Sequence, residues 1–134
     1  MTPSIEQRLL SHGMRPTRQR LAVATALFGG PDRHVTPEQL HRELAEQDTR
    51  VSLATIYNTL NQLLARGLVR EVSVTPGVTY FDTNTRPHCH VYHEPSGVLS
   101  DCDHNTLGIK LDELTLPEGT VLSRVDIVIR VRDA

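Results

Sequence analysis

Four side chains that can bind a metal ion lie in the stretch from Tyr80 to Asp101, which reads YFDTNTRPHCHVYHEPSGVLSD. They are Asp82, His88, His90 and Asp101. Residues two apart on a β-strand point to the same face, so the imidazoles of His88 and His90 could bind one ion. Imidazole and carboxylate together favour zinc, iron or manganese over calcium and magnesium, which prefer oxygen ligands. The stretch therefore predicts a divalent-metal site, with a solvated His-rich hairpin as the alternative.

His34 can add a fifth ligand from the N-terminal half, because it lies in the predicted loop before the third helix. A site that shares His34 with the other four residues would connect the two halves of the chain. Metal occupancy would then set the angle between the halves, since an ion shifts the population toward the arrangement that it binds better. A solvated loop histidine is the simpler alternative.

Cys89 lies between His88 and His90 and therefore on the opposite face of the predicted strand. Three roles are open for it: a small buried side chain, a thiolate ligand of haem iron, or a redox-sensitive thiol. We do not expect an enzyme. The H-x-H pair lacks the glycine spacing of a cupin, and nothing marks the pocket and base of a Cys-His hydrolase.

The composition is typical of a soluble globular protein: 134 residues, 38% hydrophobic and 22% charged, with a net charge of −2. No apolar run approaches the roughly 18 residues of a membrane span, and no signal peptide begins the chain, so we expect a cytoplasmic protein without membrane contact. Two cysteines, Cys89 and Cys102, are too few for a disulfide framework or a Cys-rich zinc site within one chain.

Charge is distributed unevenly along the chain. Residues 1–70 hold nine Lys and Arg against six Asp and Glu, whereas residues 71–134 hold five against ten. A basic half beside an acidic half favours nucleic-acid binding by the first and cation binding or self-association by the second.

The first 70 residues predict four helices whose ends are well marked. Their capping residues are Ser4, Thr17, Thr36 and Ser52. The fourth helix, LATIYNTLNQLLAR, carries hydroxyl and amide groups on its polar face and almost no charge. From residue 68 the period changes to two, which predicts a hairpin that turns at Thr75-Pro76-Gly77. Helices followed by such a hairpin predict a winged helix, with the fourth helix as recognition helix.

The fold class is therefore α+β, with a winged-helix domain at residues 1–82, a linker at 83–87 and a small α/β domain at 88–134. In the second domain we expect strands at 88–93, 98–101 and 121–132, and one short helix within 103–116. Its core would be thin, so we expect a homodimer.

A winged helix predicts double-stranded DNA as the partner. Backbone phosphates would be contacted by four arginines, Arg15, Arg18, Arg20 and Arg50. Base edges would be contacted from the first turns of the fourth helix, by Ser52, Thr55, Tyr57 and Asn58. Asn can pair with adenine, and Thr or Tyr can contact the thymine methyl. The alternative is a helical subdomain whose polar face meets only water.

Several motifs together resemble the ferric uptake regulator superfamily, over essentially the whole chain. They are GMRPTRQRLAVATAL, HVTPEQLHREL, VSLATIYNTLNQLLARGLV, YFDTN and HCH. Within it, SLATIYNTL and TYFDTNT look most like the iron response regulator branch of alphaproteobacteria. The resemblance implies a dimeric transcriptional regulator, such as a repressor, of iron and haem metabolism genes. The operator implied by the two-fold symmetry is palindromic, and we expect it to be A·T-rich.

The same resemblance places an interdomain metal site on the five residues His34, Asp82, His88, His90 and Asp101, for iron, manganese or zinc. The family's C-x-x-C structural zinc site falls on His93 and Ser96 and is therefore lost. The family's other metal site in the dimer domain is also incomplete, because Pro87 and Gly108 stand where its ligands would be expected. The branch commonly has three histidines, associated with haem, at His88-Cys89-His90; whether haem still binds there is left open. Two alternatives to an iron- or haem-responsive regulator remain open. One is a regulator of the same superfamily that senses manganese, zinc or peroxide, and the other is a metal-binding protein without DNA affinity.

Overall fold

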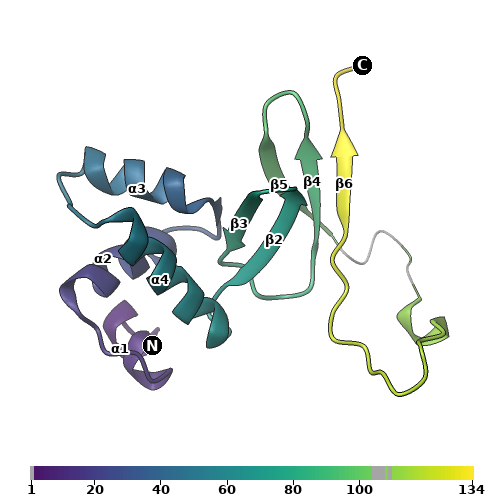
Figure 1. Cartoon of the computed structure of the whole chain (residues 1–134), viewed down its shortest axis with the longest axis horizontal. Helices are drawn as coiled ribbons and strands as arrows, with labels where there is room; N and C mark the ends of the chain where they lie inside the picture. The colour runs from purple at the N-terminus through teal and green to yellow at the C-terminus, as the bar shows by residue number, and fades with distance from the viewer. Residues whose placement is uncertain (1, 104–107, 109) are drawn as a thin grey trace. The chain divides into compact units, whose positions relative to one another are not determined.

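The computed structural model describes residues 2–103, 108 and 110–134 (Figure 1). The chain divides into two units by its contacts, unit 1 (Met1–Thr85) and unit 2 (Arg86–Ala134). Among the described residues, no helix combines the length and the apolar character needed to cross a bilayer.

Unit 1 contains four helices, α1 (Ile5–Ser11), α2 (Arg18–Phe28), α3 (Pro37–Glu46) and α4 (Leu53–Ala65). The four predicted capping residues are confirmed: each side chain accepts a hydrogen bond from the backbone N–H three residues later. These bonds satisfy donors that the first turn of a helix otherwise leaves without a partner. After α4, Gly67 has a φ of +73°, a conformation that favours glycine and ends the helix.

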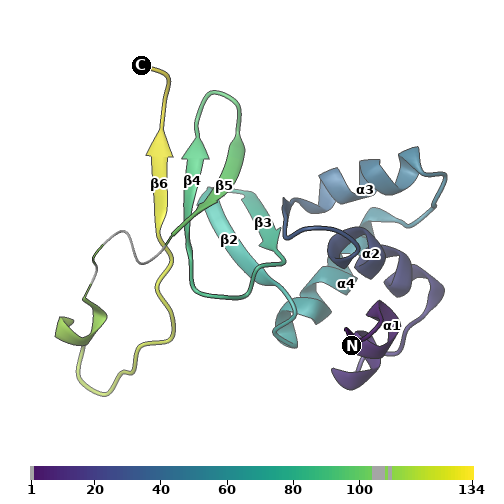
Figure 2. The same ribbon diagram turned by 180° about the vertical axis from the view of Figure 1, so that it is seen from behind.

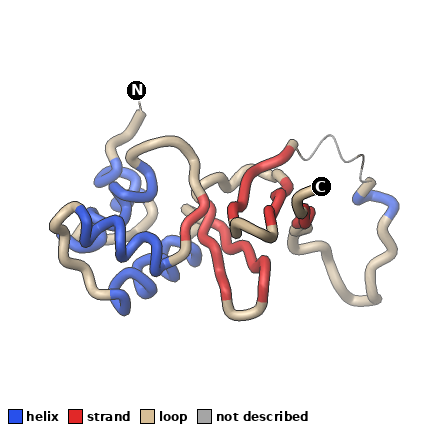
Figure 3. Tube along the Cα trace, turned by 90° about the horizontal axis from the view of Figure 1, so that it is seen from above, coloured by secondary structure: helices blue, strands red, loops and turns tan. Residues whose placement is uncertain are grey.

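The helices of unit 1 lie close together (Figure 3), and their apolar side chains form one core. From α4, Ile56, Leu60 and Leu63 are completely buried, at the spacing that places them on one face of a helix. Leu27 of α2 and Leu40 of α3 pack into the same core. Burial of each such side chain contributes roughly 1.5–3 kcal/mol. The core therefore fixes α4 by its apolar face and leaves its N-terminal polar face outward.

A three-stranded antiparallel sheet completes unit 1, in the order β1-β3-β2. The long hairpin consists of β2 (Arg70–Thr75) and β3 (Val78–Asp82), and it turns at the predicted Pro76-Gly77. The third strand, β1 (His34–Val35), was not predicted: His34 was expected in a loop. Two residues are too few to show a period of two, so only the pairing with β3 reveals this strand.

Unit 2 holds a second sheet, in the order β5-β4-β6 (Figure 2). The predicted hairpin is confirmed as β4 (Cys89–His93) and β5 (Val98–Cys102), which pair antiparallel. β6 (Val128–Val131) runs parallel to β4.

The strand expected over residues 121–132 is therefore shorter than predicted. Its register with β4 covers only Val128–Val131, whereas Val121 is 89% exposed. Alternating side chains favour a strand only where a neighbouring strand supplies backbone partners. The helix expected within 103–116 is a 3-10 turn, η2 (Leu111–Glu113), and residues 104–107 and 109 of that stretch lie outside the described residues.

Candidate metal centre and nucleic-acid interface

The two predicted ligands of unit 1, His34 and Asp82, are direct partners across β1 and β3. His34 Nε2 lies 3.3 Å from Asp82 Oδ2, and the Asp82 side chain is only 1% exposed. The other carboxylate oxygen, Oδ1, accepts a hydrogen bond of 2.9 Å from the backbone N–H of Asn84. A carboxylate this deeply buried needs such partners, because burial without them strongly disfavours a charge. The backbone therefore holds one oxygen of Asp82 while the other faces an imidazole.

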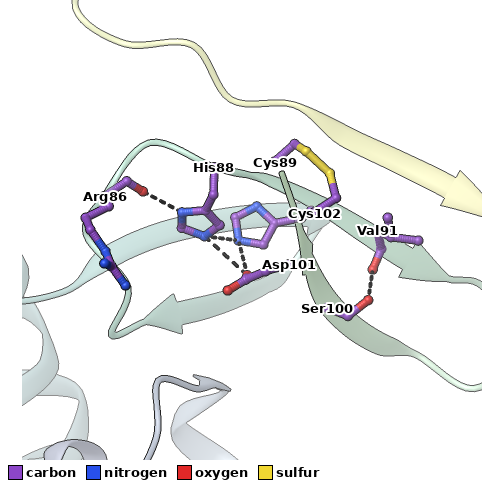
Figure 4. The surroundings of a disulfide bond; sticks show 8 residues. Arg86, His88, Cys89, Val91, Ser100, Asp101 and Cys102 are labelled. Atoms are coloured by element: carbon purple, nitrogen blue, oxygen red, sulfur yellow. Dashed lines mark hydrogen bonds and ion pairs between the residues drawn. A yellow bond between two sulfur atoms is a disulfide. The ribbon is translucent and has the colours of Figure 1, made fainter. Parts of the chain in front are cut away.

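The three predicted ligands of unit 2, His88, His90 and Asp101, converge at the start of the β4–β5 hairpin. Figure 4 shows the His88 ring beside the Asp101 carboxylate. Asp101 Oδ1 lies 3.3 Å from His88 Nε2 and 3.6 Å from His90 Nε2. The two Nε2 atoms are 3.0 Å apart. Both imidazoles are nearly buried, with side chains 7% and 9% exposed, whereas that of Asp101 is 37% exposed. Two nitrogens and one carboxylate oxygen thus face one point.

A backbone hydrogen bond fixes the orientation of the His88 ring. Its Nδ1 is hydrogen-bonded to the backbone carbonyl of Arg86. A carbonyl only accepts, so Nδ1 is the protonated nitrogen of the neutral ring and Nε2 carries the lone pair. Metal-binding histidines are typically held in this way by a backbone carbonyl. The donor set and its support fit a borderline divalent cation such as zinc, iron or manganese.

Cys89 has no free thiol in the structure. It is completely buried and forms a disulfide with Cys102, its strand partner across β4 and β5 (Figure 4). In this structure Cys89 therefore cannot be the thiolate ligand of haem iron that the triplet His88, Cys89 and His90 suggested, because a disulfide sulfur carries no thiolate charge. No local pattern predicts the pair, since 13 positions separate the two cysteines and only strand pairing brings them together.

His93 lies on the same face of β4 as Cys89 and takes no part in the cluster around Asp101. Its ring nitrogens are hydrogen-bonded to Ser96 Oγ at 2.6 Å and to Asp133 Oδ1 at 2.8 Å. The two positions at which the C-x-x-C zinc site was expected to be lost, His93 and Ser96, are thus hydrogen-bonded to each other. This trio connects the β4–β5 turn with the end of the chain after β6.

The polar face of α4 begins with Ser52 and Thr55. The Ser52 hydroxyl caps the helix and donates to Thr55 Oγ1 at 2.8 Å. Tyr57 and Asn58 are exposed one turn further on. Tyr57 is 40% exposed. The four side chains are uncharged and lie at the N-terminal end of the helix.

Glu38 of α3 is a neighbour of this face that the sequence did not single out. The Tyr57 hydroxyl donates a hydrogen bond of 2.6 Å to Glu38 Oε1. This bond, with the nearby negative charge, raises the pKa of Tyr57 above its ordinary value. Glu38 lies in the first turn of α3, where an acidic residue is common for helix stability alone, so its sequence position gave no functional signal.

The predicted phosphate contacts lie near the same helices. Arg15, Arg18 and Arg50 are exposed, and Arg20 is half-buried. Arg18 and Arg50 line one groove between the start of α2 and the segment before α4. Arg20 donates from Nη1 to the backbone carbonyl of Arg15 at 3.2 Å, so part of its guanidinium supports the loop before α2.

A sequence profile of the Ferric uptake regulator family matches residues 11–130. The chain belongs to this family. It is 38% identical over 96 residues to ferric uptake regulation protein 1 of Mycolicibacterium fortuitum, a match that covers 71% of this chain and 58% of that protein. It is 33% identical over 89 residues to the peroxide-responsive repressor PerR of Staphylococcus epidermidis, covering 66% and 59%. The match thus spans less than two thirds of these relatives.

Solved structures of the family have the same fold. A ferric uptake regulator from Vibrio cholerae superposes with a TM-score of 0.82 at 21% identity, over 97% of this chain and all of that chain. A manganese-containing ferric uptake regulator from Pseudomonas aeruginosa gives 0.76 at 24% identity, over 98% of both chains. The fold class is accordingly the predicted one, an N-terminal winged-helix unit followed by a small α/β unit.

Proposed function

We propose that this chain is a homodimeric, metal-responsive transcriptional regulator that binds operator DNA and controls iron and haem metabolism genes. The observation that carries the proposal is the pair of ligand sets, His34 with Asp82 in unit 1 and His88, His90 and Asp101 in unit 2. Family membership supports the regulatory role. The motifs SLATIYNTL and TYFDTNT support the iron response branch.

The two ligand sets together would bind one ion per protomer. Unit 1 offers two donors and unit 2 offers three, whereas a stable divalent site usually needs at least four ligands. Neither set supplies four protein ligands alone, and we propose that one ion uses both sets instead of completing its shell with water. The bound cation would supply the positive charge that holds the two carboxylates and three imidazoles together. It would thereby favour one arrangement of the units over others.

The chain's own residues prepare such a site. The carbonyl of Arg86 orients His88, and the backbone N–H of Asn84 orients Asp82. Nearly complete burial of Asp82 and of both unit 2 imidazoles keeps water away from the ligand atoms. The fixed orientation of His88 and Asp82 reduces the conformational entropy lost when an ion binds.

The DNA-reading element in this proposal is α4. Its first turns would enter the major groove and present Ser52, Thr55, Tyr57 and Asn58 to an A·T-rich sequence, because Asn pairs with adenine and apolar groups contact the thymine methyl. Phosphates would be bound by four basic side chains, Arg15, Arg18, Arg20 and Arg50. Two-fold symmetry of a homodimer makes the operator palindromic.

The effector is proposed to be iron, with manganese or zinc as the second candidate, since the ligand set accepts all three. Peroxide is a further candidate because a PerR repressor is among the relatives. Regulation by haem would have to use His88 or His90, since the sulfur of Cys89 is bonded to Cys102. Haem would then compete with the divalent ion for the same nitrogens.

The decisive experiment measures DNA binding by the full chain with and without metal. The probes are an A·T-rich palindrome from its own promoter region and a scrambled duplex, at two salt concentrations. We expect tight binding to the palindrome only with Fe²⁺ or Mn²⁺, and a salt dependence that reports phosphate contacts. Metal binding without any DNA affinity would establish the non-regulatory alternative, and metal-independent DNA binding would refute the sensing role.

A further inference from the structure

We propose that Cys89 and Cys102 form a dithiol that a peroxide oxidises, and that the disulfide raises the metal affinity of the ligand set His88, His90 and Asp101. The inference rests on the metal site proposed above and adds a control on it. It assigns to the two cysteines a role that the metal-binding residues themselves do not have.

The position of the pair suggests this control. Cys89 and Cys102 are register partners with Cα atoms 5.1 Å apart, within the range that a disulfide requires. Cys89 lies between the two histidines in sequence, and Cys102 directly follows Asp101. Because side chains alternate along a strand, the disulfide lies on one face of the hairpin and the ligand cluster on the other (Figure 4).

The register connects the disulfide with the ligand cluster. The next pair along the two strands is His90 and Asp101. β5 carries Asp101 and, within the part of the sheet that the structure describes, pairs only with β4. The half-exposed Asp101 therefore depends on β4–β5 pairing for its distance of 3.6 Å from His90. A covalent link at the adjacent pair holds that spacing, and its reduction lets the end of β5 move away from β4.

Ligands that are already held together bind an ion more tightly, because less conformational freedom is lost on binding. The close cluster seen here belongs to the disulfide form of the chain. The oxidised protein should thus be the form with higher affinity. A disulfide in a protein that works in a reducing compartment is as a rule transient and redox-sensing, which fits a switch better than a permanent link.

Burial sets the order of the oxidation steps. Cys102 is only partly buried, whereas Cys89 is completely buried, so a peroxide reaches Cys102 first. The Cys102 thiolate attacks the O–O bond, forms a sulfenic acid and releases water after protonation. The Cys89 thiol then attacks the sulfenic sulfur, the S–S bond forms and a second water leaves. One H₂O₂ accepts two electrons and two protons from the two thiols, and a dithiol reductant reverses the reaction.

The test begins with metal-free full-length protein that has been reduced and then freed of reductant under anaerobic conditions. One portion receives one equivalent of H₂O₂, and thiol titration and intact mass are measured on both portions. We expect the oxidised portion to lose both thiols and two hydrogens in mass. Its affinity for Mn²⁺, measured by calorimetry, should be about tenfold higher than that of the reduced portion, a gain comparable to ordering one side chain before binding.

Cysteine variants test whether the two thiols cause the peroxide-dependent change in Mn²⁺ affinity. Cys89→Ser with Cys102→Ser should bind Mn²⁺ like the reduced parent with or without peroxide. Cys89→Ala with Cys102→Ala replaces this pair if serine at the buried site lowers thermal stability. Cys89→Ser alone leaves Cys102 exposed to peroxide and should yield a sulfenic acid that dimedone traps. Cys102→Ser alone should react far more slowly, because Cys89 is buried.

The outcomes distinguish this inference from the proposed metal site. Equal Mn²⁺ affinity of the oxidised and reduced parent would overturn the switch and leave the site intact. No Mn²⁺ binding by either form would instead refute the site. A mass gain of one oxygen on a histidine while both thiols persist would place peroxide chemistry on a metal ligand, which also overturns the dithiol.

Discussion

The metal site is tested most directly by replacement of both histidines of unit 2 with alanine. His88→Ala with His90→Ala removes two of the three donors of that unit and leaves Asp101, whose side chain is 37% exposed. Loss of a residue that only orients a ligand typically lowers metal affinity 10- to 100-fold, and loss of a direct ligand should lower it at least as much. For two ligands the product is about 10²- to 10⁴-fold, or about 3–5 kcal/mol.

Calorimetric titration of the metal-free protein with Mn²⁺ measures this loss. The matched control is His93→Ala, which removes an imidazole from the same strand, β4. That ring contacts Ser96 and Asp133 instead of Asp101, so Mn²⁺ affinity should change less than about threefold in the control. Thermal unfolding without metal shows whether each variant retains its fold.

Two results would refute the assignment. If the double variant still binds one Mn²⁺ per protomer within tenfold of the parent, the ion is bound elsewhere. If His93→Ala weakens binding as much as the double variant while the fold is retained, the ion lies on the other face of β4. Either result would also remove the premise that one ion uses both ligand sets.

Three further changes test the ligand set of unit 1 and the face of α4. Asp82→Asn keeps an acceptor for the Asn84 N–H but loses the carboxylate charge. If both ligand sets bind one ion, Mn²⁺ affinity measured by calorimetry should fall about 10- to 100-fold. An unchanged Mn²⁺ affinity would argue against an ion shared by the two sets. Tyr57→Ala should weaken operator binding about 10- to 100-fold with metal content unchanged, as measured by fluorescence anisotropy; equal affinity would exclude Tyr57 from recognition. Glu38→Gln should lower the pKa of Tyr57, so tyrosinate absorbance appears at lower pH, and an unmoved midpoint would contradict the contact.

The sign of the last effect follows from the hydrogen bond. Glu38 stabilises the protonated hydroxyl of Tyr57, so the folded-state pKa is raised above the unfolded value near 10. The contribution of the bond to stability is complete below the unfolded pKa and is lost as the pH rises through the folded pKa. At neutral pH the tyrosine is therefore protonated and held by α3, and a change in its DNA contacts cannot be ascribed to its ionisation.

The features that the sequence predicted well are those encoded by neighbouring residues. A capping side chain such as Ser52 bonds the backbone three residues later, so its pattern is visible in any short window. The turn at Pro76-Gly77 is equally local, because glycine tolerates the positive φ that the turn needs. The spacing of His88 and His90 placed both imidazoles on one side for the same reason.

The features that the sequence did not predict depend on pairing between distant segments. His34 lies in a strand only because β3 lies beside it, and the pattern over 121–132 became a strand only where β4 supplies partners. The disulfide likewise required the register of β4 with β5. Loop closure and register are global properties, and a short window of sequence carries little information on either.

Alternation along β4 offers one physical explanation for why metal and sulfur chemistry would occur together in this chain. A period of two that directs His88 and His90 to one face necessarily directs Cys89 to the other. On β5 the same rule separates Asp101 from Cys102, and the antiparallel register then matches histidine with aspartate and cysteine with cysteine. Whatever changes the spacing of these two strands changes both pairs at once. A change in oxidation state would therefore reach the ligands through the backbone of the hairpin, without any contact between sulfur and metal.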